Sequence, residues 1–405
     1  MRRAILLIAL AIAANIAVAQ VPKMVIPPSS VERPEDIGER MHTHLFMYAP
    51  DPSVTPDAPP PGSTVETPGS IACIYGLVSS TPGCPVATAT TVPTGGSGTI
   101  VLVDAYDDPS ASADLKTFST RWGLPAANFT KQYASGTKPA NGCASGWELE
   151  EALDIQWAHA MAPKAKIVLM EAASNSDADL FAAVVAASGY IGTHGTFKGE
   201  VSMSWGSSEF SLEGIYDPDM VFPNVVYFAS SGDTSPPSYP STSPLVVSAG
   251  ATQIQRDSSG NYTKQIATRS CNPGATGCGG GDSIYESRPS YQGGVSGVVG
   301  SWRGTPDIAS DSSSNSPVWV YDSSCYGGWV EVYGTSVASP TLAGIINRAG
   351  SFKADSNAEL TEIYNNRTNI ADYTDITSGS CAGHTGKSGY DLCTGVGVVK
   401  GYGKK

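Results

Sequence analysis

Charge is scarce in this sequence, and positive charge most of all. Only 15% of the 405 residues are Asp, Glu, Lys or Arg, whereas 41% are hydrophobic. A chain this apolar can bury a large core, which excludes intrinsic disorder as its main state. The 24 basic residues are outnumbered by 37 acidic ones, and the net charge of -13 would repel a polyanion. We therefore expect no binding of nucleic acid.

Long apolar runs are also scarce. One such run, residues 4–14, follows Arg2 and Arg3 and precedes the small residues Ala17 and Ala19. This arrangement is typical of a secretory signal peptide, which we predict at residues 1–19. The run is short for a membrane span, which needs about 20 apolar residues, and no later stretch approaches that length. We expect a secreted protein, extracellular or periplasmic, that is not held in a membrane after signal cleavage.

The eight cysteines contain no Cys-x-x-Cys pair, which argues against a zinc site. In an oxidising compartment they favour structural disulfides instead, and neighbours in the sequence are the simplest partners, although other pairings remain open. The pairs that we predict are Cys73 with Cys84, Cys271 with Cys278, and Cys381 with Cys393, which leaves Cys143 and Cys325.

The chain divides near residue 70. Residues 20–69 hold eleven of the 29 prolines and predict an extended leader or linker, a short or remnant pro-segment. Residues 70–405 predict one α/β domain, in which nearly continuous apolar strands alternate with helices. This pattern indicates a doubly wound, mostly parallel central sheet flanked by helices, followed by a loop-rich C-terminal region. The expected strands are 98–105, 165–171, 200–205, 224–229 and 245–249, and the expected helices are 112–122, 147–161, 177–187 and 336–349.

The sharpest local motif is Tyr-Gly-Thr-Ser-Val-Ala-Ser-Pro-Thr-Leu-Ala-Gly at residues 333–344. Ser336 opens a predicted helix of small residues, so its hydroxyl would lie at a turn and its N–H near the positive end of the helix. Such a position suits a nucleophile. A serine that only caps a helix has the same geometry, so the motif by itself leaves both interpretations open.

Histidine, the usual base for a serine nucleophile, occurs only five times. The candidates are His42, His44, His159, His194 and His384. His194 lies in Gly-Thr-His-Gly-Thr, which resembles the histidine motif of subtilisins. That histidine should open a long packed helix, whereas here the chain passes directly into a predicted strand. Because a catalytic base must first be correctly placed, a neutral peptidase that uses His194 is only an alternative.

The predicted helix at residues 147–161 offers a different base. Glu150 and Asp154 are four residues apart and share one face, beside an apolar ridge of Leu149, Leu153 and Trp157. Two carboxylates this close to an apolar surface repel each other, so one should keep its proton to higher pH and form a coupled acid/base pair. The alternative for an isolated helix is a solvated acidic face.

Several motifs, in one order from about Gly98 to Gly397, resemble those of the sedolisins, the serine-carboxyl peptidases of subtilisin-like fold. They are Glu-x-x-Leu-Asp, Ala-His-Ala-Met-Ala-Pro-x-Ala-Lys-Ile, Ser-x-Ser-Trp-Gly, Ser-Ser-Gly-Asp, Tyr-Pro-x-x-Ser-Pro and Gly-Thr-Ser. The resemblance implies that Ser336 is the nucleophile, Glu150 the general base and Asp154 its orienting partner.

The same resemblance implies that Asp233, in Ser-Ser-Gly-Asp, is an acid that lines the oxyanion hole. A protonated carboxylic acid can donate a hydrogen bond to a developing oxyanion, whereas a carboxylate would repel it. Such a site should work best in acid. Local chemistry by itself would make Asp233 a turn residue after glycine.

The resemblance also implies one structural Ca²⁺ in the C-terminal region. Its ligands would be the carboxylates of Asp375 and Asp391 and the carbonyls of Ile376, Lys387 and Gly389, with water supplying the rest. Lys387 stands where the family more often has glycine. Without the resemblance this stretch would be interpreted as a polar loop.

The expectation is therefore a secreted, acid-active, calcium-stabilised serine endopeptidase, a monomer that acts on protein or peptide substrates. We interpret Asp104 and Asp107, after the first strand, as structural, because the helix pair already supplies the acids. Two departures from the family's pattern are the short proline-rich leader and the Ser-Ser-Glu that follows Trp205-Gly206 in the region lining the cleft. The short leader motivates an alternative, a secreted binding protein of the same fold with weak or no catalysis.

Overall fold

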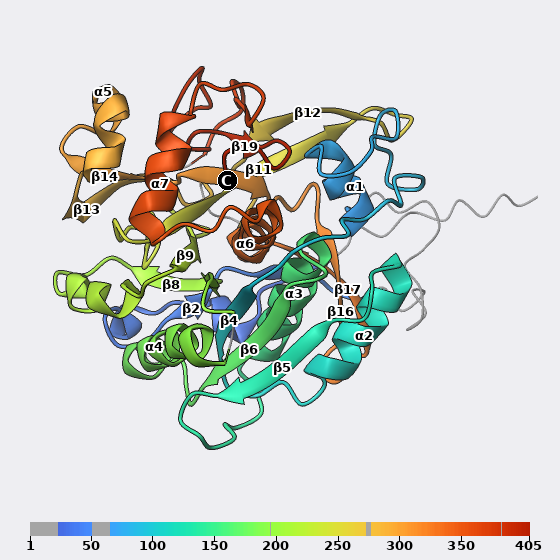
Figure 1. Ribbon diagram of the computed structural model, residues 1–405, viewed down its shortest axis with the longest axis vertical. Helices are drawn as coiled ribbons and strands as arrows, with labels where there is room; N and C mark the ends of the chain where they lie inside the picture. The colour runs from blue at the N-terminus through green and yellow to red at the C-terminus, as the bar shows by residue number, and fades with distance from the viewer. Residues whose placement is uncertain (1–22, 51–64, 195, 273–276, 382) are drawn as a thin grey trace, which may run out of the picture.

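The computed structural model describes residues 23–50, 65–194, 196–272, 277–381 and 383–405 (Figure 1). The predicted signal peptide lies outside these ranges. Within them, the central sheet has ten strands, which run parallel except for β12 and β18 at its margins. In sheet order the strands are β18 Tyr373–Thr374, β19 Val398–Val399, β15 Ile308–Asp311, β11 Val247–Arg256, β9 Val225–Ser230, β7 Gly199–Met203, β4 Thr99–Ala105, β6 Lys166–Ala172 and β5 Asn128–Tyr133, with β12 Tyr262–Ala267 paired to β11.

Helices cover both faces of this sheet, as Figure 1 shows. Alternate residues of β4 point to opposite faces: Ile100 and Leu102 join the core beneath α2, α3 and α6, whereas Val101 and Val103 join the core beneath α4. The layered α/β architecture that the sequence predicts is thereby confirmed. The helices are α1 Pro68–Ile74, α2 Ala111–Trp122, α3 Trp147–Met161, α4 Asp177–Thr193, α5 Ser296–Val299, α6 Ala338–Ala349 and α7 Ser356–Asn365.

Three smaller sheets lie around the central one. The first has the order β1–β3–β17–β16, the second β10–β8–β2, and the third is the pair β13–β14. Their strands are β1 Met24–Val25, β2 His42–Thr43, β3 Phe46–Tyr48, β8 Trp205–Ser208, β10 Ser238–Tyr239, β13 Gly281–Ser287, β14 Trp302–Thr305, β16 Val318–Asp322 and β17 Gly328–Tyr333. The strands of the first two sheets include β1, β2 and β3, all from the proline-rich N-terminal part.

The larger described part of that region, residues 23–50, is not the extended linker that its composition predicts. We name it the leader segment. Its residues 41–47 are all buried against the domain. The prediction was wrong here because proline content reflects local stiffness, whereas this stretch finds backbone partners on β8 and β17, far away in the sequence.

Other differences lie at element boundaries and in the second half of the chain. The sequence predicts no strands after residue 253, but the structure has short antiparallel strands there, such as β12 and β13. The many glycine and serine residues of this region hide the alternation of apolar and polar side chains. The predicted helix from Ser336 instead begins as a 3-10 turn, Thr335–Val337, before α6. The predicted strand 200–205 breaks at Ser204, between β7 and β8.

The cysteines form four disulfides, Cys73–Cys84, Cys143–Cys325, Cys271–Cys278 and Cys381–Cys393. This confirms the predicted neighbour pairs and joins the remaining two. The one cluster of metal-ligating side chains among the described residues is Glu148 with Cys143 and Cys325, whose sulfurs are already bonded to each other. Zinc therefore has no thiolate ligands in this part of the chain.

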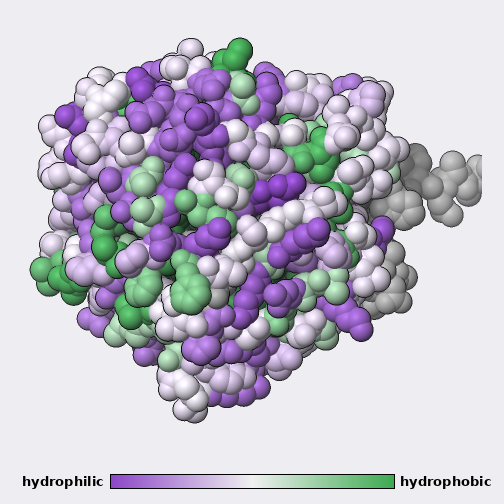
Figure 2. Space-filling model, viewed as in Figure 1, coloured by the Kyte–Doolittle hydropathy of each residue, from purple (hydrophilic) through white to green (hydrophobic). Residues whose placement is uncertain are grey.

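Surface polarity agrees with the composition. On the face shown in Figure 2, hydrophilic side chains predominate and apolar ones occur in small groups. Within the described ranges, none of the helices has both the length and the apolar content to cross a bilayer.

Candidate active site

Ser336 lies between β17 and α6, in the 3-10 turn that precedes the helix. Its Oγ is 2.9 Å from Oε2 of Glu150, to which it donates a hydrogen bond, and 3.0 Å from the carbonyl oxygen of Ser204. The Ser336 side chain is fully buried. A buried hydroxyl that donates to a carboxylate is held ready to lose its proton, as a nucleophile requires.

Glu150 and Asp154 follow each other by one turn of α3 and are both completely buried. Asp154 Oδ1 accepts a hydrogen bond of 2.7 Å from Ser204 Oγ. Burial raises the pKa of Glu150 well above its ordinary value, with repulsion from Asp154 and Asp104 adding to it. Burial and the charge of Asp104 likewise raise the pKa of Asp154, against hydrogen bonds from Ser204 and Glu150. The acidic face of this helix is thus not solvated, and the two carboxyls are suited to share a proton.

A third carboxyl, that of Asp104, completes this buried acidic group. It stands near the end of β4, and neither oxygen has a hydrogen-bond partner among the described residues. Burial raises the pKa of Asp104 to about 8. Asp107, by contrast, binds Lys131 and Lys138 at 2.7 and 3.0 Å. Asp107 therefore fits the structural interpretation, whereas Asp104 acts electrostatically on the pair in α3.

Asp233 follows β9 and faces the turn that carries Ser336. Its Oδ1 accepts hydrogen bonds from Thr335 N at 2.7 Å and Thr335 Oγ1 at 2.8 Å, whereas Oδ2 has no partner among the described residues. Burial raises the pKa of Asp233 well above its ordinary value, and the two bonds from Thr335 oppose this only in part. The orientation leaves Oδ2 as the oxygen that can carry a proton and donate it to a bound group.

Gly334 makes room for that bound group. Its φ is +115°, a conformation that favours glycine. A Cβ at this position would lie 2.6 Å from Asp233 Oδ2 and 2.2 Å from the carbonyl oxygen of His44. The carboxyl and this carbonyl oxygen therefore border the same small space, and Ser336 N donates to the same oxygen at 3.0 Å. The space has the donors of an oxyanion hole.

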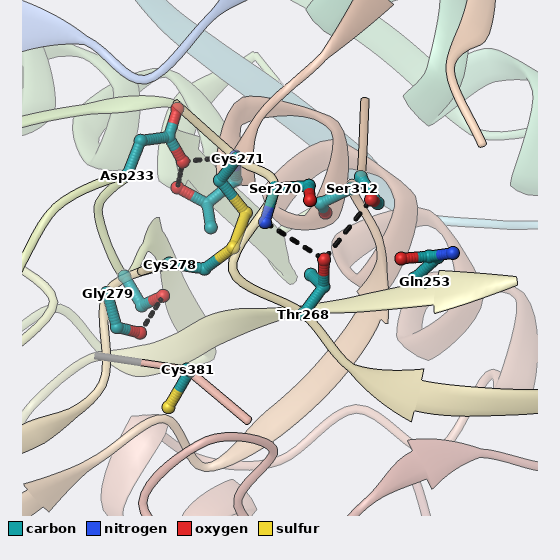
Figure 3. Close-up of a disulfide and its surroundings, with 12 residues drawn as sticks. Asp233, Gln253, Thr268, Ser270, Cys271, Cys278, Gly279, Ser312 and Cys381 are labelled. Atoms are coloured by element: carbon teal, nitrogen blue, oxygen red, sulfur yellow. Dashed lines mark hydrogen bonds between the residues drawn. A yellow bond between two sulfur atoms is a disulfide. The ribbon is translucent and has the colours of Figure 1, made fainter. Parts of the chain in front are cut away.

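The Cys271–Cys278 disulfide supports the turn that carries Asp233 (Figure 3). Directly after it, Gly279 N donates to Gly232 O at 2.6 Å, and Ser231 Oγ donates to Gly279 O at 2.8 Å. A Cβ on Gly279 would lie 2.2 Å from the Ser231 carbonyl oxygen, so the two backbones are in close contact. Gly279, the residue after Cys278, thereby holds the Ser-Ser-Gly-Asp turn in place.

The leader segment passes directly through this site. β2 pairs antiparallel with β8, and β3 pairs antiparallel with β17, so the connecting His44–Leu45 bond lies beside Ser336. The His44 side chain is buried, and its Nδ1 is 2.6 Å from Ser230 Oγ. Burial lowers the pKa of His44 to about 3, so the imidazole is neutral even in moderately acidic solution.

Comparison with known proteins finds similarity to named peptidases. No family model matches the chain. Sedolisin from Pseudomonas sp. (strain 101) is 35% identical over 128 residues, 31% of this chain and 21% of that protein. Kumamolisin from Bacillus sp. (strain MN-32) is 28% identical over 273 residues, 62% of this chain and 47% of that protein. The solved structure of Pseudomonas sedolisin, a serine-carboxyl proteinase, covers 83% of this chain and 95% of its own with a TM-score of 0.67 and 23% identity.

The chain is thus similar to several sedolisins over parts of its length. It spans less than half the length of the curated relatives that it matches. At 23% identity, the structural likeness to Pseudomonas sedolisin shows the subtilisin-like fold and no more. The roles of individual residues therefore rest on the geometry of this chain itself.

His194, the alternative base, lies at the opposite edge of the sheet. It follows α4 at the surface, where its ring stacks on Tyr190 and its carbonyl accepts a hydrogen bond from Lys166, the first residue of β6. Ser336 lies instead near Ser204, at the carboxyl end of β7. A base on His194 could not reach this hydroxyl.

The predicted calcium ligands lie in two loops that pack together. Gly389 N donates to Asp375 Oδ2, and Lys387 N donates to Asp391 Oδ2, each at 2.9 Å. A Cβ on Gly386 would lie 2.8 Å from the carbonyl oxygen of Ile376, so the loops touch through their backbones. Carboxylate and carbonyl oxygens are the ligands that Ca²⁺ prefers, and the donor set is chemically suitable. In this structure, however, amide N–H groups bind both carboxylates.

Three residues of the site were given no catalytic role from the sequence. His44 was set aside with its leader, Asp104 was interpreted as structural, and Ser204 stood in the Ser-x-Ser-Trp-Gly motif without a role. Asp104 carried a usable signal, an acid at the end of a strand next to the predicted site. Ser204 carried its place in the Ser-x-Ser-Trp-Gly motif. His44 carried none, because its contribution is mainly through backbone atoms that only the fold brings to Ser336.

Proposed function

We propose that this protein is an exported, acid-active serine-carboxyl endopeptidase that hydrolyses peptide bonds in proteins or peptides. The observation that supports it most is the 2.9 Å hydrogen bond from Ser336 Oγ to the buried carboxyl of Glu150. The peptidases among its relatives agree with the assignment. The predicted signal peptide and the four disulfides support export.

The proposed reaction begins when Ser336 Oγ attacks the substrate carbonyl carbon and its proton passes to Glu150. Asp154, hydrogen-bonded to Ser204, orients Glu150 and shares the added proton. Negative charge on the substrate oxygen is stabilised by Ser336 N–H and by protonated Asp233. Glu150 then gives the proton to the leaving amine, and an acyl ester on Ser336 remains. Water attacks this ester while one of its protons passes to Glu150; the C–O bond to Ser336 then breaks, Glu150 returns the proton to Ser336 Oγ, and the second product leaves as a carboxylic acid.

The raised pKa values give the proposal its pH dependence. Asp233 can donate only while protonated, and the acidic pair can share a proton only below the pH at which both carboxyls ionise. A raised pKa keeps these protonated forms populated in acid and removes them as pH rises. We expect activity to fall on the alkaline side as Asp233 loses its proton.

We also propose one structural Ca²⁺ held by Asp375, Ile376, Lys387, Gly389 and Asp391. The ion would supply positive charge between two acidic loops and take no part in the reaction. For Asp391, which is buried, binding would require the amide N–H of Lys387 to turn away. We expect the chain to act as a monomer.

The leader segment supports a second candidate, a binding protein of the same fold without turnover. Its residues 42–48 fill the cleft, and the cavity that remains beside them is only about 310 Å³. The two candidates are separated by incubating denatured protein at about pH 4 with wild type, Ser336→Ala and Glu150→Gln. The peptidase predicts cleavage by the wild type and a loss of at least about a thousandfold in both variants. Equal, negligible cleavage by all three would support the binding protein.

A further inference from the structure

The strand β8, Trp205–Ser208, forms one wall of the cleft. Gly206, Ser207 and Ser208 line its cavity, and the backbone of β8 pairs with the segment that lies in the cleft. The chain passes from β8 directly into Glu209, the acid of the Ser-Ser-Glu sequence. The contacts of Glu209 therefore act on the end of the strand to which a substrate would bind.

Glu209 fastens the end of β8 to β13. Oε1 of its buried carboxyl accepts a hydrogen bond from Ser283 Oγ, and Oε2 accepts one from Ile284 N at 3.1 Å. Ser283 Oγ in turn accepts from Tyr285 N at 3.1 Å and from Glu286 N at 2.7 Å, so its proton is committed to Glu209. β8 and β13 lie on the same side of the molecule (Figure 1). A single carboxyl thus joins the wall of the cleft to a neighbouring strand pair.

A second carboxyl, that of Glu213, lies against the first. It begins the 3-10 turn Glu213–Ile215 and is buried. Its Oε2 accepts from Phe210 N at 2.9 Å, whereas Oε1 receives no hydrogen bond from a donor in the described parts of the chain. The side chains of Glu209 and Glu213 are hydrogen-bonded to each other. Because two carboxylates have no proton to donate, this bond requires one proton, and Glu213 Oε1 is the oxygen that is free to carry it.

The charged groups around this pair are mainly acidic. A Cβ added at Gly214 would lie 3.6 Å from Glu286 Oε1, so Glu286 is close to the turn that carries Glu213. The cation Arg303 is bound to Asp307 at 2.6 Å. The titratable and charged side chains of the neighbouring elements are Asp217, Tyr239 of β10, Glu286 of β13, Tyr291, Arg303 of β14, and Glu32 of the leader segment, which accepts from Ser208 N at 2.7 Å.

Burial raises the pKa of Glu209 and that of Glu213, and repulsion by Glu209 adds to the increase at Glu213. Burial also raises the pKa of Glu286 to about 7, with repulsion from Asp217 and Glu209 adding to it and Arg303 opposing it. With raised values, the pair keeps its shared proton in acid and loses it as pH rises above the ordinary carboxyl pKa of about 4.3. The loss leaves two buried carboxylates side by side, which repel each other where a hydrogen bond had joined them.

From this geometry we propose that Glu209 and Glu213 are positioning residues that form an acid-closed clamp: while they share one proton they hold β8 against β13 in the form that binds substrate, and without that proton β8 loosens. The proposal rests on the peptidase function above. The hydrogen bonds of both carboxyls go to β13, to Phe210 and to each other, and not to Ser336. The clamp should therefore change KM, whereas kcat depends on Glu150 and Asp233.

The first measurement is kcat and KM of the full chain on denatured protein between about pH 4 and about pH 8. The wild-type KM should rise about tenfold over this range, because losing one hydrogen bond to a charged group changes binding by about that factor. Glu213→Gln places an amide donor beside Glu209 that does not titrate. Its KM should stay within about twofold over the same range, while its kcat follows the wild-type pH profile.

The second measurement does not depend on turnover. Amide hydrogen exchange is followed in inactive Ser336→Ala at about pH 4 and about pH 8, with each rate corrected for the intrinsic effect of pH. Protection of residues 205–216 should be at least about tenfold lower at the higher pH, whereas β4 should stay protected at both. Adding Glu213→Gln should keep residues 205–216 protected at both pH values. Ser283→Ala, which removes a donor to Glu209 from outside the pair, should lower their protection already in acid.

The control is Glu359→Gln in α7. Glu359 is also buried, neither of its oxygens has a hydrogen-bond partner in the described residues, and burial raises its pKa to about 7. The charges that act on it are those of Lys353, Glu362 and Lys405, which are not part of the clamp. This variant should leave the pH dependence of KM, and of the protection of β8, as in the wild type.

The clamp is wrong if KM rises equally with pH in Glu213→Gln and in the wild type. It is also wrong if residues 205–216 of Ser336→Ala are equally protected at both pH values, or if Ser283→Ala leaves their protection unchanged. If the exchange results agree with the clamp while the wild type cleaves denatured protein no faster than Ser336→Ala, the clamp on β8 stands and the peptidase function fails.

Discussion

Gly334→Ala tests the oxyanion space through one methyl group. The added Cβ would lie 2.2 Å from the position of the His44 carbonyl oxygen and 2.6 Å from Asp233 Oδ2. Both distances are far below van der Waals contact, and the nearer one involves backbone. A carbonyl group that is to be attacked must therefore move away from Ser336 N and from Asp233.

The expected magnitude follows from the donors that are lost. Losing one oxyanion donor typically lowers kcat by about 10²–10³, or about 2.7–4 kcal/mol, so a fall in kcat/KM of at least about a hundredfold is expected. The substitution also strains the backbone at φ +115°, which should lower the free energy of unfolding by about 1–3 kcal/mol. The loss of activity should thus accompany a protein that still folds.

The assay combines initial rates on denatured protein at about pH 4 with urea unfolding of the same preparation. The control is Gly327→Ala, since Gly327 has φ +72° and a Cβ there meets nothing within 4 Å. This control carries a comparable strain of about 1–2 kcal/mol without the clash, and its kcat/KM should match the wild type. If Gly334→Ala retains kcat/KM within about twofold of the wild type, the carbonyl group does not bind where the structure implies, and the oxyanion assignment is refuted.

Three further predictions concern stability and the supports of the site. The pKa of Asp104 is raised to about 8 by burial, so its contribution to stability is fully present below its unfolded pKa of about 4 and is lost as pH rises toward 8. Urea unfolding of Ser336→Ala from pH 4 to 8 should show that the free energy of unfolding decreases by about 1.4 kcal/mol per pH unit for each such carboxyl. Adding Asp104→Asn should make this dependence on pH weaker. A free energy of unfolding that increases with pH would contradict the burial argument. Added Ca²⁺ at about 100 times Kd should stabilise the wild type by about 2.7 kcal/mol and leave the stability of Asp391→Ala unchanged. The measurement is a thermal melt with Ca²⁺ and with a chelator. Equal melting temperatures for the wild type in both conditions would contradict the proposed calcium site. Replacing Cys271 and Cys278 together by Ser should lower kcat about tenfold with little change in KM, because the turn that positions Asp233 loosens. The control is the same double replacement of Cys73 and Cys84, which lie away from the site. An equally large loss of kcat in this control would show that only general stability had changed.

Local sequence was sufficient for the elements whose pattern is strong. The apolar run at β4 and the buried helix α3 occur where the sequence predicts them, because a fully buried strand and a long packed helix dominate their own windows. Short strands such as β16 and β17 were missed, since strands of only five or six residues give too weak an alternation. The close spacing of six cysteines was enough to predict three of the four disulfides.

One part of the candidate site could be predicted from the sequence and another could not. Glu150 and Asp154 are four residues apart in a helix, so the sequence predicts that they lie side by side. That Ser336 meets this face, although it is 186 positions away from Glu150 in the sequence, depends on α3 and α6 packing on the same side of the sheet. Core residues of α3 and α6 hold the two helices together, and neither sequence motif indicates that these helices are in contact.

The sequence by itself determined the residue types, the layered α/β fold and the acidic pair, because each depends on periodicity over a few turns or on short loops. Only the tertiary structure decided that a proline-rich leader is bound in the cleft, that His44–Leu45 faces the nucleophile, and that Asp104 joins the buried acids. These depend on backbone hydrogen bonds and burial between distant segments, for which composition and spacing carry no signal.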